Sequence, residues 1–314
     1  MAADAKGRSM ASSSTTRSRL APAKVNYALH VTGRRADGYH LIDSLVGFPA
    51  IGDRVTASPA AEGFDLVVSG PFAEPLARAG NMAENLVLQA AGALAHHAGI
   101  APQGLHLTLE KNLPIAAGIG GGSSDAAATL KLLRDLWAPD LADAELARIG
   151  LALGADLPMC LNGRPARVTG IGETVTAVPP LPDHTLLLVN PGTCIATPTI
   201  FKALTRRDNP PLPDLPRGGF GSLEDFVDWL GETRNDLEPP AIDTAPVIGE
   251  VLAALRQHQP IRLARMSGSG ATCFAIVDNA VEAGEIAARI AAQHANWWIR
   301  SAPVISSQGT ADGT

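Results

Sequence analysis

The stretch LPIAAGIGGGSSDAAATL, from Leu113 to Leu130, decides how this sequence is interpreted. Four glycines fall between Gly118 and Gly122, and two serines, an aspartate and an alanine-rich run follow at once. Glycine lets the backbone approach a ligand without interference from a Cβ atom. The free N–H groups at the start of a helix, with the helix dipole behind them, attract anions. The stretch therefore predicts a phosphate-binding loop that leads into a helix.

The spacing of this stretch excludes two familiar phosphate loops. It contains no GxxxxGK[ST], so it is not a Walker A loop. It does not complete GxGxxG either, because Ser123 stands where the third glycine would be. A dinucleotide-binding fold would also begin with a βαβ unit, whereas several antiparallel-looking strands precede this loop. From the residues alone two interpretations stay open, a phosphate loop and a flexible or closely packed glycine turn.

The segments beside the glycine stretch have clear periodicity. Residues 105–112, LHLTLEKN, alternate apolar and polar side chains and predict a strand. Ser123, Ser124 and Asp125 have the chemistry of a helix N-cap. We therefore expect a helix over residues 126–137 and a second one over residues 143–153.

The remaining elements form a mixed order. The order predicts an α+β protein with two lobes and a ligand cleft between them. Composition shifts near residues 179–184, where a proline-rich link precedes a buried strand. Strands are expected near residues 23–33, 53–58, 64–70, 184–191 and 271–277, with two more around a glycine turn within residues 166–178. Helices are expected near residues 81–99, 223–230, 245–257 and 281–295.

Composition limits the class of protein. The 314 residues are 46% hydrophobic and 18% charged, which describes an ordinary globular protein. Aromatic residues make up 4% and the net charge is −6, which argues against a nucleic-acid surface. No apolar run approaches the ~18 residues of a membrane span. We expect a small-molecule ligand, no nucleic acid and no membrane; a monomer and a homodimer stay open.

The first residues and the cysteines suggest a location. Residues 1–19 are rich in Ser, Thr and Arg and have no apolar core, so they do not predict a secretory signal. We expect a disordered tail there and a second one over residues 307–314. Cys160, Cys194 and Cys273 lie far apart and predict no disulfide framework, so a reducing cytoplasm is expected.

Two charged residues outside the glycine stretch suggest chemistry. Lys24 and Asn26 are two apart in an expected strand, which places them on one face. Asp156 lies in GADLP, between apolar neighbours. A buried aspartate beside a lysine can act as a base for a hydroxyl proton. A solvated lysine and a capping aspartate are the alternatives, and the sequence does not say whether Lys24 and Asp156 meet.

Three motifs in order resemble one family of kinases. They are PAKVNYALHVTGRRADGYH (residues 22–40), the glycine stretch (residues 113–127) and MSGSGATCFAIV (residues 266–277). Together they resemble the galactokinase, homoserine kinase, mevalonate kinase and phosphomevalonate kinase (GHMP) superfamily, from about residue 20 to about residue 305. The resemblance implies an α+β, two-lobed GHMP kinase fold. It implies an ATP-binding N-terminal lobe similar to domain 2 of ribosomal protein S5 (residues 20–178) and a ferredoxin-like C-terminal lobe (residues 179–306).

Within the superfamily, RADGYH, the triple glycine before SSDAA, and LGADLP are most similar to kinases of non-mevalonate isoprenoid biosynthesis. These enzymes transfer the ATP γ-phosphate to the 2-hydroxyl of a cytidine diphosphate-linked methylerythritol. The resemblance implies that Asp156 is the catalytic base and that Lys24 holds it ionised. It also implies a set of substrate-binding residues: Asn26, Tyr39, His40, Thr197 and Phe201, with Tyr39 and Phe201 flanking the cytosine ring.

The resemblance further implies ATP and Mg²⁺. Ser124 is the residue expected to contact the metal, with a purely structural serine as the alternative. The residues expected to bind ATP are Asn85, Leu86, Lys111, Pro114, Ile115, Ala116, Ala117, Gly118, Ile119, Gly120, Gly121, Gly122, Ser123 and Ser124. Ala116 and Ala117 depart from the glycines or serines of many family members, and we expect them to be tolerated with φ below zero.

Two alternatives to this function are considered. One is another GHMP kinase acting on a different alcohol such as homoserine or mevalonate. The other is a nucleotide-binding regulator without catalysis, which would be expected to lack Lys24 or Asp156. A dehydrogenase is disfavoured because the glycine spacing fails.

Overall fold

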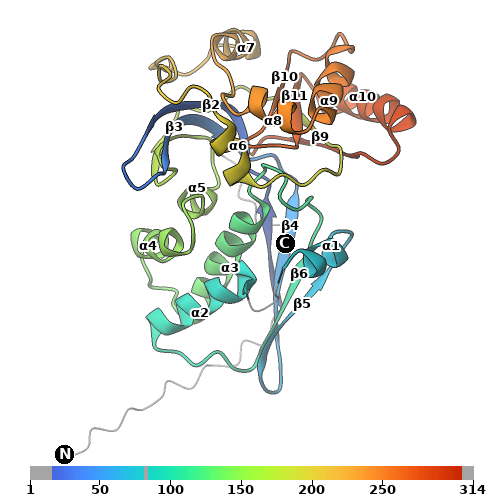
Figure 1. Ribbon diagram of the computed structural model, residues 1–314. Helices are drawn as coiled ribbons and strands as arrows, with labels where there is room; N and C mark the ends of the chain where they lie inside the picture. Colours follow the sequence, from blue (N-terminus) through green and yellow to red (C-terminus); the bar gives the residue numbers. More distant parts are fainter. Residues whose placement is uncertain (1–15, 81–83, 306–314) are drawn as a thin grey trace, which may run out of the picture.

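The computed structural model describes residues 16–80 and 84–305. Figure 1 shows two halves, with the elements of the glycine stretch at their junction. The lower half holds a sheet with α1 to α4, and the upper half holds the strands and helices of the C-terminal part together with β2 and β3. This arrangement confirms the α+β class and the two lobes.

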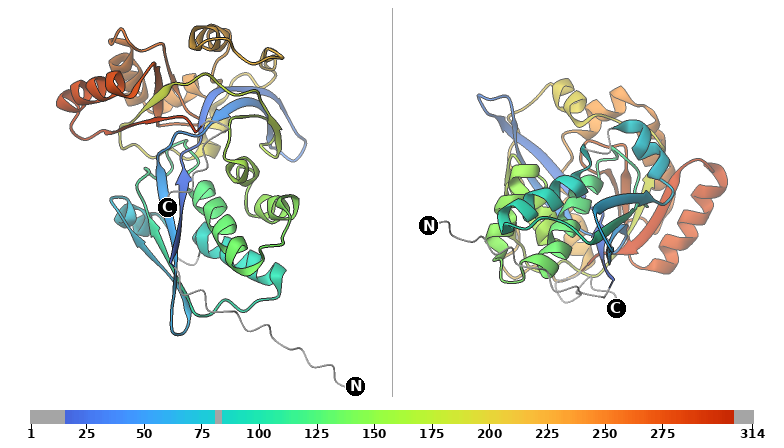
Figure 2. Two further views of the ribbon diagram at one scale, coloured as in Figure 1. Left: turned by 180° about the vertical axis from the view of Figure 1, so that it is seen from behind. Right: turned by 90° about the horizontal axis from the view of Figure 1, so that it is seen from below.

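The lower half is built on a four-stranded sheet of order β1-β4-β6-β5. Only β5 and β6 run parallel in this sheet, and its other pairs are antiparallel. Helices α2, α3 and α4 lie together on one side of this sheet in Figure 2, and their apolar side chains share one core with it. The strands are β1 (Arg17–Pro22), β4 (Gly52–Pro59), β5 (Phe64–Ser69) and β6 (Leu105–Glu110), and the helices are α1 (Ala73–Ala79), α2 (Leu86–Ala98), α3 (Gly121–Trp137) and α4 (Asp143–Leu153).

A second sheet, of order β2-β3-β7-β8, joins the two halves. All of its neighbouring strands are antiparallel. Leu29 and Val31 of β2 belong to the core of the C-terminal helices, and Leu29 bridges to Asn235. The elements are β2 (Val25–Arg34), β3 (His40–Gly47), β7 (Ala166–Gly170), β8 (Thr174–Ala177) and the short helix α5 (Leu157–Asn162).

The third sheet has the order β10-β11-β9-β12, and every pair in it is antiparallel. Its strands are connected by α9 and α10 in the sequence β9, α9, β10, β11, α10, β12, which is a ferredoxin-like arrangement. The strands are β9 (Thr185–Asn190), β10 (Leu263–Met266), β11 (Cys273–Val277) and β12 (Trp298–Pro303), and the helices are α6 (Thr197–Ala203), α7 (Leu223–Gly231), α8 (Glu238–Thr244), α9 (Val247–Arg256) and α10 (Ala280–Gln293).

Some of the predicted element boundaries agree with the structure and others do not. The helix expected over residues 143–153 has those bounds as α4, whereas the helix expected from residue 81 begins at Leu86, and residues 81–83 lie outside the described part. The N-terminal tail was predicted to reach residue 19, and this is wrong because β1 begins at Arg17 and pairs with β4. The C-terminal tail lies outside the described residues. The lobe boundary after residue 178 stays a prediction.

The described residues also bear on the cysteines and the membrane. All three cysteines are free, and Cys194 is exposed whereas the other two are buried. Among residues 16–80 and 84–305, no helix has the length and apolar character needed to cross a bilayer.

Candidate active site

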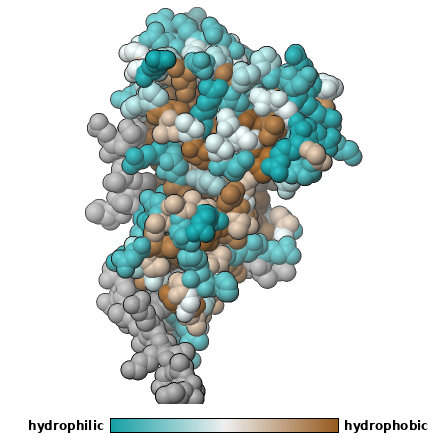
Figure 3. Space-filling model, turned by 90° about the vertical axis from the view of Figure 1, so that its left-hand side faces the viewer, coloured by the Kyte–Doolittle hydropathy of each residue, from teal (hydrophilic) through white to brown (hydrophobic). Residues whose placement is uncertain are grey.

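A cavity of about 1170 Å³ lies where the two halves meet. Cavities for one small molecule are commonly about 300–1,000 Å³, so this one has room for two ligands. In Figure 3 the surface narrows between the halves, with apolar residues beside the narrowing. Of the residues expected in the site, the cavity is lined by Lys24, Asn26, Tyr39, His40, Asn85, Leu86, Lys111, Pro114, Ile115, Ala116, Ala117, Gly118, Gly120, Gly121, Gly122, Ser123, Asp156, Thr197 and Phe201.

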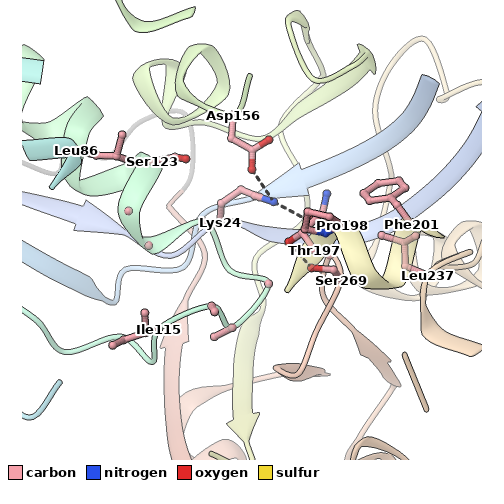
Figure 4. A pocket seen from close by; sticks show the side chains of 18 of the residues that line it. Lys24, Leu86, Ile115, Ser123, Asp156, Thr197, Pro198, Phe201, Leu237 and Ser269 are labelled. Atoms are coloured by element: carbon pink, nitrogen blue, oxygen red, sulfur yellow. Dashed lines mark hydrogen bonds and ion pairs between the residues drawn. The ribbon is translucent and has the colours of Figure 1, made fainter. Parts of the chain in front are cut away.

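Lys24 and Asp156 meet in this cavity, although 132 positions separate them in the sequence (156 minus 24). Lys24 lies in the short link between β1 and β2, where its backbone N–H donates to the carbonyl of Ile119 at 2.8 Å. Its Nζ lies 3.5 Å from Oδ2 of Asp156 and donates to Oδ1 of Asn26 at 2.9 Å. Figure 4 shows the pair at the centre of the cavity.

Asp156 directly precedes α5, but its side chain does not cap that helix. Its carboxylate is 41% exposed, whereas the Lys24 side chain is 8% exposed. The alternative of a capping aspartate is therefore not what the structure shows. The Asp156 carboxylate is accessible to a ligand, while the Lys24 ammonium is held by its hydrogen bond to Asn26.

Asn26 is the residue that holds Lys24 in place. Besides accepting from Lys24, it donates through Nδ2 to the Ser44 hydroxyl at 2.8 Å. Its backbone N–H donates to Oγ of Ser267 at 3.1 Å, which links it to the third motif. Because Asn26 is 2% exposed, this geometry gives it an orienting role toward Lys24; a direct contact with substrate stays a prediction.

The glycine loop wraps the start of α3. Gly118 and Gly120 have φ of 73° and 66°, in the left-handed region that favours glycine. A Cβ at Gly118 would lie 2.5 Å from the carbonyl oxygen of Ser267, and a Cβ at Gly120 would lie 3.2 Å from Cβ of Lys24. Close packing against the third motif and against Lys24 therefore requires these glycines. The structure therefore confirms a closely packed glycine turn. The first turn of α3 also faces the cavity, and phosphate binding there stays a prediction.

Three expectations for this loop are wrong. The helix begins at Gly121 with Gly120 as its N-cap and no side-chain cap, so residues 123–125 lie inside the first turns. The Ser124 hydroxyl therefore points inward, donating to the carbonyl of Pro22 at 2.7 Å, and Ser124 does not line the cavity. Ser123 is the serine at the cavity wall, so the structure contradicts a metal contact by Ser124. Ile119, also expected at ATP, is buried in the core instead.

Ala116 adopts a conformation that the sequence did not predict. Its φ is 49°, although alanine was expected to keep φ below zero. A left-handed residue with a Cβ costs about 1–2 kcal/mol, so this turn is strained. Ala117 keeps a negative φ and packs in the core.

A buried ionic group lies behind the loop. Lys111 at the end of β6 donates from Nζ to Oδ2 of Asp53 and, at 2.8 Å, to Oδ2 of Asp125. The other oxygen of Asp53 accepts from the backbone N–H groups of Asn112 and Leu113, at 2.6 and 2.8 Å. The three charged side chains are at most 5% exposed. This group fixes the end of β6 against the first turns of α3.

The two acids of this group differ. Burial raises the pKa of Asp125 to about 8; the Lys111 ammonium opposes this rise and the Asp53 carboxylate adds to it. Burial alone would lower the pKa of Lys111, but the two carboxylates leave it raised. Oδ1 of Asp125 is buried without a hydrogen-bond partner. Burial therefore favours the protonated form of Asp125.

Aromatic residues gather at the other side of Lys24. The rings of His40 and Phe201 stack with centroids 4.9 Å apart and planes 24° apart. Tyr39 is 60% exposed. Because His40 already stacks on Phe201, a base between Tyr39 and Phe201 would have to compete with that stacking. Thr197, at the start of α6, shares a hydrogen bond of 2.9 Å with Ser269 of the third motif.

Several residues of the site were not predicted. Asp53 carries no signal in the sequence, because its partner Lys111 is 58 positions away on a neighbouring strand. Ser267 and Ser269 lie in a motif that the sequence analysis singled out without assigning either residue a contact. The doubled arginine at residues 206–207 was a visible signal, and Arg207 lines the cavity.

Residues 85–164 match the model of the GHMP kinases N terminal domain, and residues 212–296 match the model of the GHMP kinases C terminal domain. The first match includes the glycine loop and Asp156. The second covers α7 to α10 and includes the third motif.

Relatives and solved structures agree with these matches. The 4-diphosphocytidyl-2-C-methyl-D-erythritol kinase of Chelativorans sp. (strain BNC1) is 50% identical over 90% of this chain and 94% of its own length. The crystal structure of a 4-(cytidine 5'-diphospho)-2C-methyl-D-erythritol kinase is 33% identical, has a TM-score of 0.73, and covers 91% of this chain and 98% of its own. The homoserine kinase from Cytophaga hutchinsonii, 18% identical, shares the fold with a TM-score of 0.67 over 98% of this chain and 99% of its own. The chain therefore belongs to the GHMP kinase family of small-molecule kinases.

Proposed function

We propose that this kinase transfers the γ-phosphate of ATP to the 2-hydroxyl of 4-diphosphocytidyl-2-C-methyl-D-erythritol, a step of non-mevalonate isoprenoid precursor biosynthesis. The observation that carries the proposal is the Lys24–Asp156 pair beside the glycine loop, in a cavity with room for two ligands. Relatives about half identical over most of their length carry the name of that enzyme. The cytoplasm is the proposed location.

ATP is assigned to the side of the cavity at the glycine loop. In Figure 4, Leu86 and Ser123 lie on one side of the Lys24–Asp156 pair, and Thr197 and Phe201 lie on the other. The backbone of residues 114–122 and the first turn of α3 would bind the phosphates. Asn85, the N-cap of α2, and Leu86 would contact the nucleoside, with Lys111 behind them.

Magnesium fits this site as an ion held mainly by ATP. Among the described residues, no three His, Cys, Asp or Glu side chains come together as a metal cage. Mg²⁺ in kinases uses phosphate oxygens and water with only one or two protein ligands, so no cage is needed. Ser123 and Asp156 offer oxygens at the cavity wall. When bound, the ion would neutralise phosphate charge.

The residues of the pair then have separate roles. The substrate 2-hydroxyl loses its proton to Asp156 as its oxygen bonds to the γ-phosphorus, and the bond between that phosphorus and the β,γ-bridging oxygen breaks to release ADP. Lys24 stabilises the charge that develops on the transferred group. Phosphoryl transfer depends mainly on positioning and charge stabilisation, and Asn26 supplies positioning for Lys24.

The substrate side is assigned from the aromatic residues. The cytosine would stack on Phe201, with Tyr39 and His40 beside it, and Thr197 would donate to the linked alcohol or its phosphates. Loss of a ring that stacks on a base costs about 1–3 kcal/mol. Phe201→Ala should therefore raise KM for the cytidyl substrate about 5- to 150-fold and change KM for ATP little.

The experiment is ADP release with ATP and Mg²⁺ across three alcohols: the cytidyl substrate, homoserine and mevalonate. Wild type and Asp156→Asn are compared on each. Turnover of the cytidyl substrate alone, lost in the variant, supports the proposal. Turnover of a different alcohol keeps the family and refutes the substrate. ATP binding without turnover of any alcohol identifies a nucleotide-binding regulator instead.

A further inference from the structure

Three cationic side chains line the cavity near Phe201, away from the glycine loop. Arg34 is the last residue of β2, Lys202 follows Phe201 in α6, and Arg207 lies just after α6. They come from two parts of the chain far apart in sequence. The fold therefore gathers positive charge on the Phe201 side of the cavity.

These cations have no carboxylate partner. Within residues 16–80 and 84–305, none of the three forms an ion pair, and Arg34 donates only to the backbone carbonyl of Gly38, at 3.2 Å. The carboxylate nearby in the cavity wall, Asp37, is paired with Arg35 at 2.7 Å. Nε of Arg207 is buried without a hydrogen-bond partner. A buried donor left unmade costs free energy, so this end of the cavity lacks an acceptor.

His40 lies near enough to two of these guanidinium groups to be affected by their charge. Burial lowers the pKa of His40, and the positive charges of Arg34 and Arg207 lower it further. Its Nε2 is also buried without a partner. Since His40 stacks on Phe201, Arg34 and Arg207 surround the same end of the cavity as the aromatic pair. In Figure 4, Phe201 lies across the Lys24–Asp156 pair from Ser123.

We propose that Arg34, Lys202 and Arg207 bind the diphosphate of a nucleoside diphosphate-linked alcohol and thereby select it over an uncharged alcohol. This inference rests on the proposed function. The substrate needs its diphosphate between a base at Phe201 and a hydroxyl at Asp156. Guanidinium groups bind phosphate oxygens through paired, charge-assisted hydrogen bonds, and the unpartnered Nε of Arg207 is such a donor.

The test compares two neighbouring arginines. Arg207→Met removes the guanidinium whose Nε is buried without a partner. Arg206→Met is the matched control, because Arg206 is exposed, lies 3.7 Å from Asp208 and does not line the cavity. Calorimetric titrations of the full chain with CDP and with cytidine give the two Kd values. A saturating non-hydrolysable ATP analogue keeps both probes out of the nucleotide end.

The expected result is a loss of affinity for CDP that is much larger than the loss of affinity for cytidine, which has no phosphate. Arg207→Met should weaken CDP binding at least about ten-fold, the size of one charge-assisted hydrogen bond, and cytidine binding less than about two-fold. Arg206→Met should leave both within about two-fold. The CDP affinity of wild type should fall with salt more steeply than that of the variant.

Further variants guard against a folding defect. Lys202→Met alters an exposed side chain and should weaken CDP binding about three-fold or more without changing the melting temperature. Arg207→Lys keeps the positive charge but loses the paired donors of the planar guanidinium. It should bind CDP more tightly than Arg207→Met and less tightly than wild type.

Three results would overturn the inference. Equal loss of CDP and cytidine would show that Arg207 supports the aromatic pair rather than phosphate. Unchanged CDP binding in Arg207→Met and Lys202→Met, with normal wild-type turnover, would refute the diphosphate site and leave the proposed function intact. A wild type that neither binds CDP nor turns over the cytidyl substrate would remove both together.

Discussion

Lys24 and Lys111 line the same cavity and both meet aspartate, but their surroundings are opposite. Lys24 lies 3.5 Å from an aspartate that is 41% exposed, and its short hydrogen bond goes to a neutral amide. Lys111 is clamped between two aspartates that are at most 5% exposed. A loosely paired, open carboxylate can exchange partners with a ligand, whereas a closed group can only hold the chain in place.

The difference shows that one cavity contains two lysines with different roles, one suited to catalysis and one to stability. The closed group, which consists of Lys111, Asp53 and Asp125, holds β4, β6 and α3 together, so the glycine loop is anchored to a fixed support. The open pair, which consists of Lys24 and Asp156, is connected to the glycine loop through the backbone hydrogen bond from Lys24 N–H to the Ile119 carbonyl. We expect changes at the open pair to remove activity with little loss of stability, and changes at the closed group to do the reverse.

The largest expected effect is on the rate at the open pair. Asp156→Asn and Lys24→Met should each lower kcat about 10²- to 10⁴-fold, because they remove the base and the charge that stabilises the transferred phosphoryl group. Their free energies of unfolding should stay within about 1 kcal/mol of wild type, since the Lys24–Asp156 pair is long, at 3.5 Å, and the Asp156 side chain is 41% exposed. ADP release and urea unfolding measure the two quantities. A loss of stability as large as the loss of transition-state energy would contradict the separation.

The next effect is on stability at the closed group. Lys111→Met leaves Asp53 and Asp125 buried without their cation, so the free energy of unfolding should fall by about 3–5 kcal/mol. Lys24→Met is the matched control, a buried lysine of the same cavity changed to the same residue. Urea unfolding of both variants checks this. Equal destabilisation by the two substitutions would show that the closed group has no special structural role.

Much of the site was predictable because its chemistry depends on residue type. The glycines, Lys24 and Asp156 stand out in the sequence, and the cavity brings them together. That Lys24 and Asp156 touch required the fold, since each lies at the end of a different element. The ring that covers Phe201 could not be foreseen, because His40 and Phe201 belong to segments joined only by tertiary packing.

The fold was less completely predictable from local pattern. The helix α4 carries a clear periodicity and was predicted with its observed bounds. Strand β1 was missed in part because RSRLAP is polar and resembles a tail; its pairing with β4 makes it a strand. Ser124 was assigned to the metal from the resemblance, and the helix was expected from residue 126, five residues after its observed first residue, Gly121 (126 minus 121). A shift of that size turns a different side chain inward.

A pH titration sharpens the contrast within the closed group. The folded-state pKa of Asp125 is about 8, above the ordinary 3.8, so between these values the folded state binds a proton that the unfolded state has lost. Stability should therefore fall as pH rises from about 4 to about 8 and level off above, with a slope of up to about 1.4 kcal/mol per pH unit. Asp125→Asn, which is neutral at all pH values, should lack this fall.

Urea unfolding of wild type and Asp125→Asn at pH 5 to 9 isolates this effect, because the other titrating groups cancel in the difference between the two proteins. A difference that does not change with pH would mean that Asp125 is ionised in the folded state throughout. The closed group would then carry a net negative charge beside the ATP phosphates.

The smallest effects distinguish two adjacent serines that repeat the same contrast. Ser124→Ala removes a buried hydrogen bond to Pro22 and should lower the free energy of unfolding by about 1 kcal/mol without changing the Mg²⁺ dependence of the rate. Ser123→Ala removes a hydroxyl from the cavity wall and should raise the Mg²⁺ concentration for half-maximal rate about 3- to 10-fold, with stability within about 0.5 kcal/mol. ADP release against Mg²⁺ and urea unfolding check both. A raised Mg²⁺ requirement in Ser124→Ala alone would return the metal contact to Ser124, and would mean that the first turn of α3 rearranges when ATP binds.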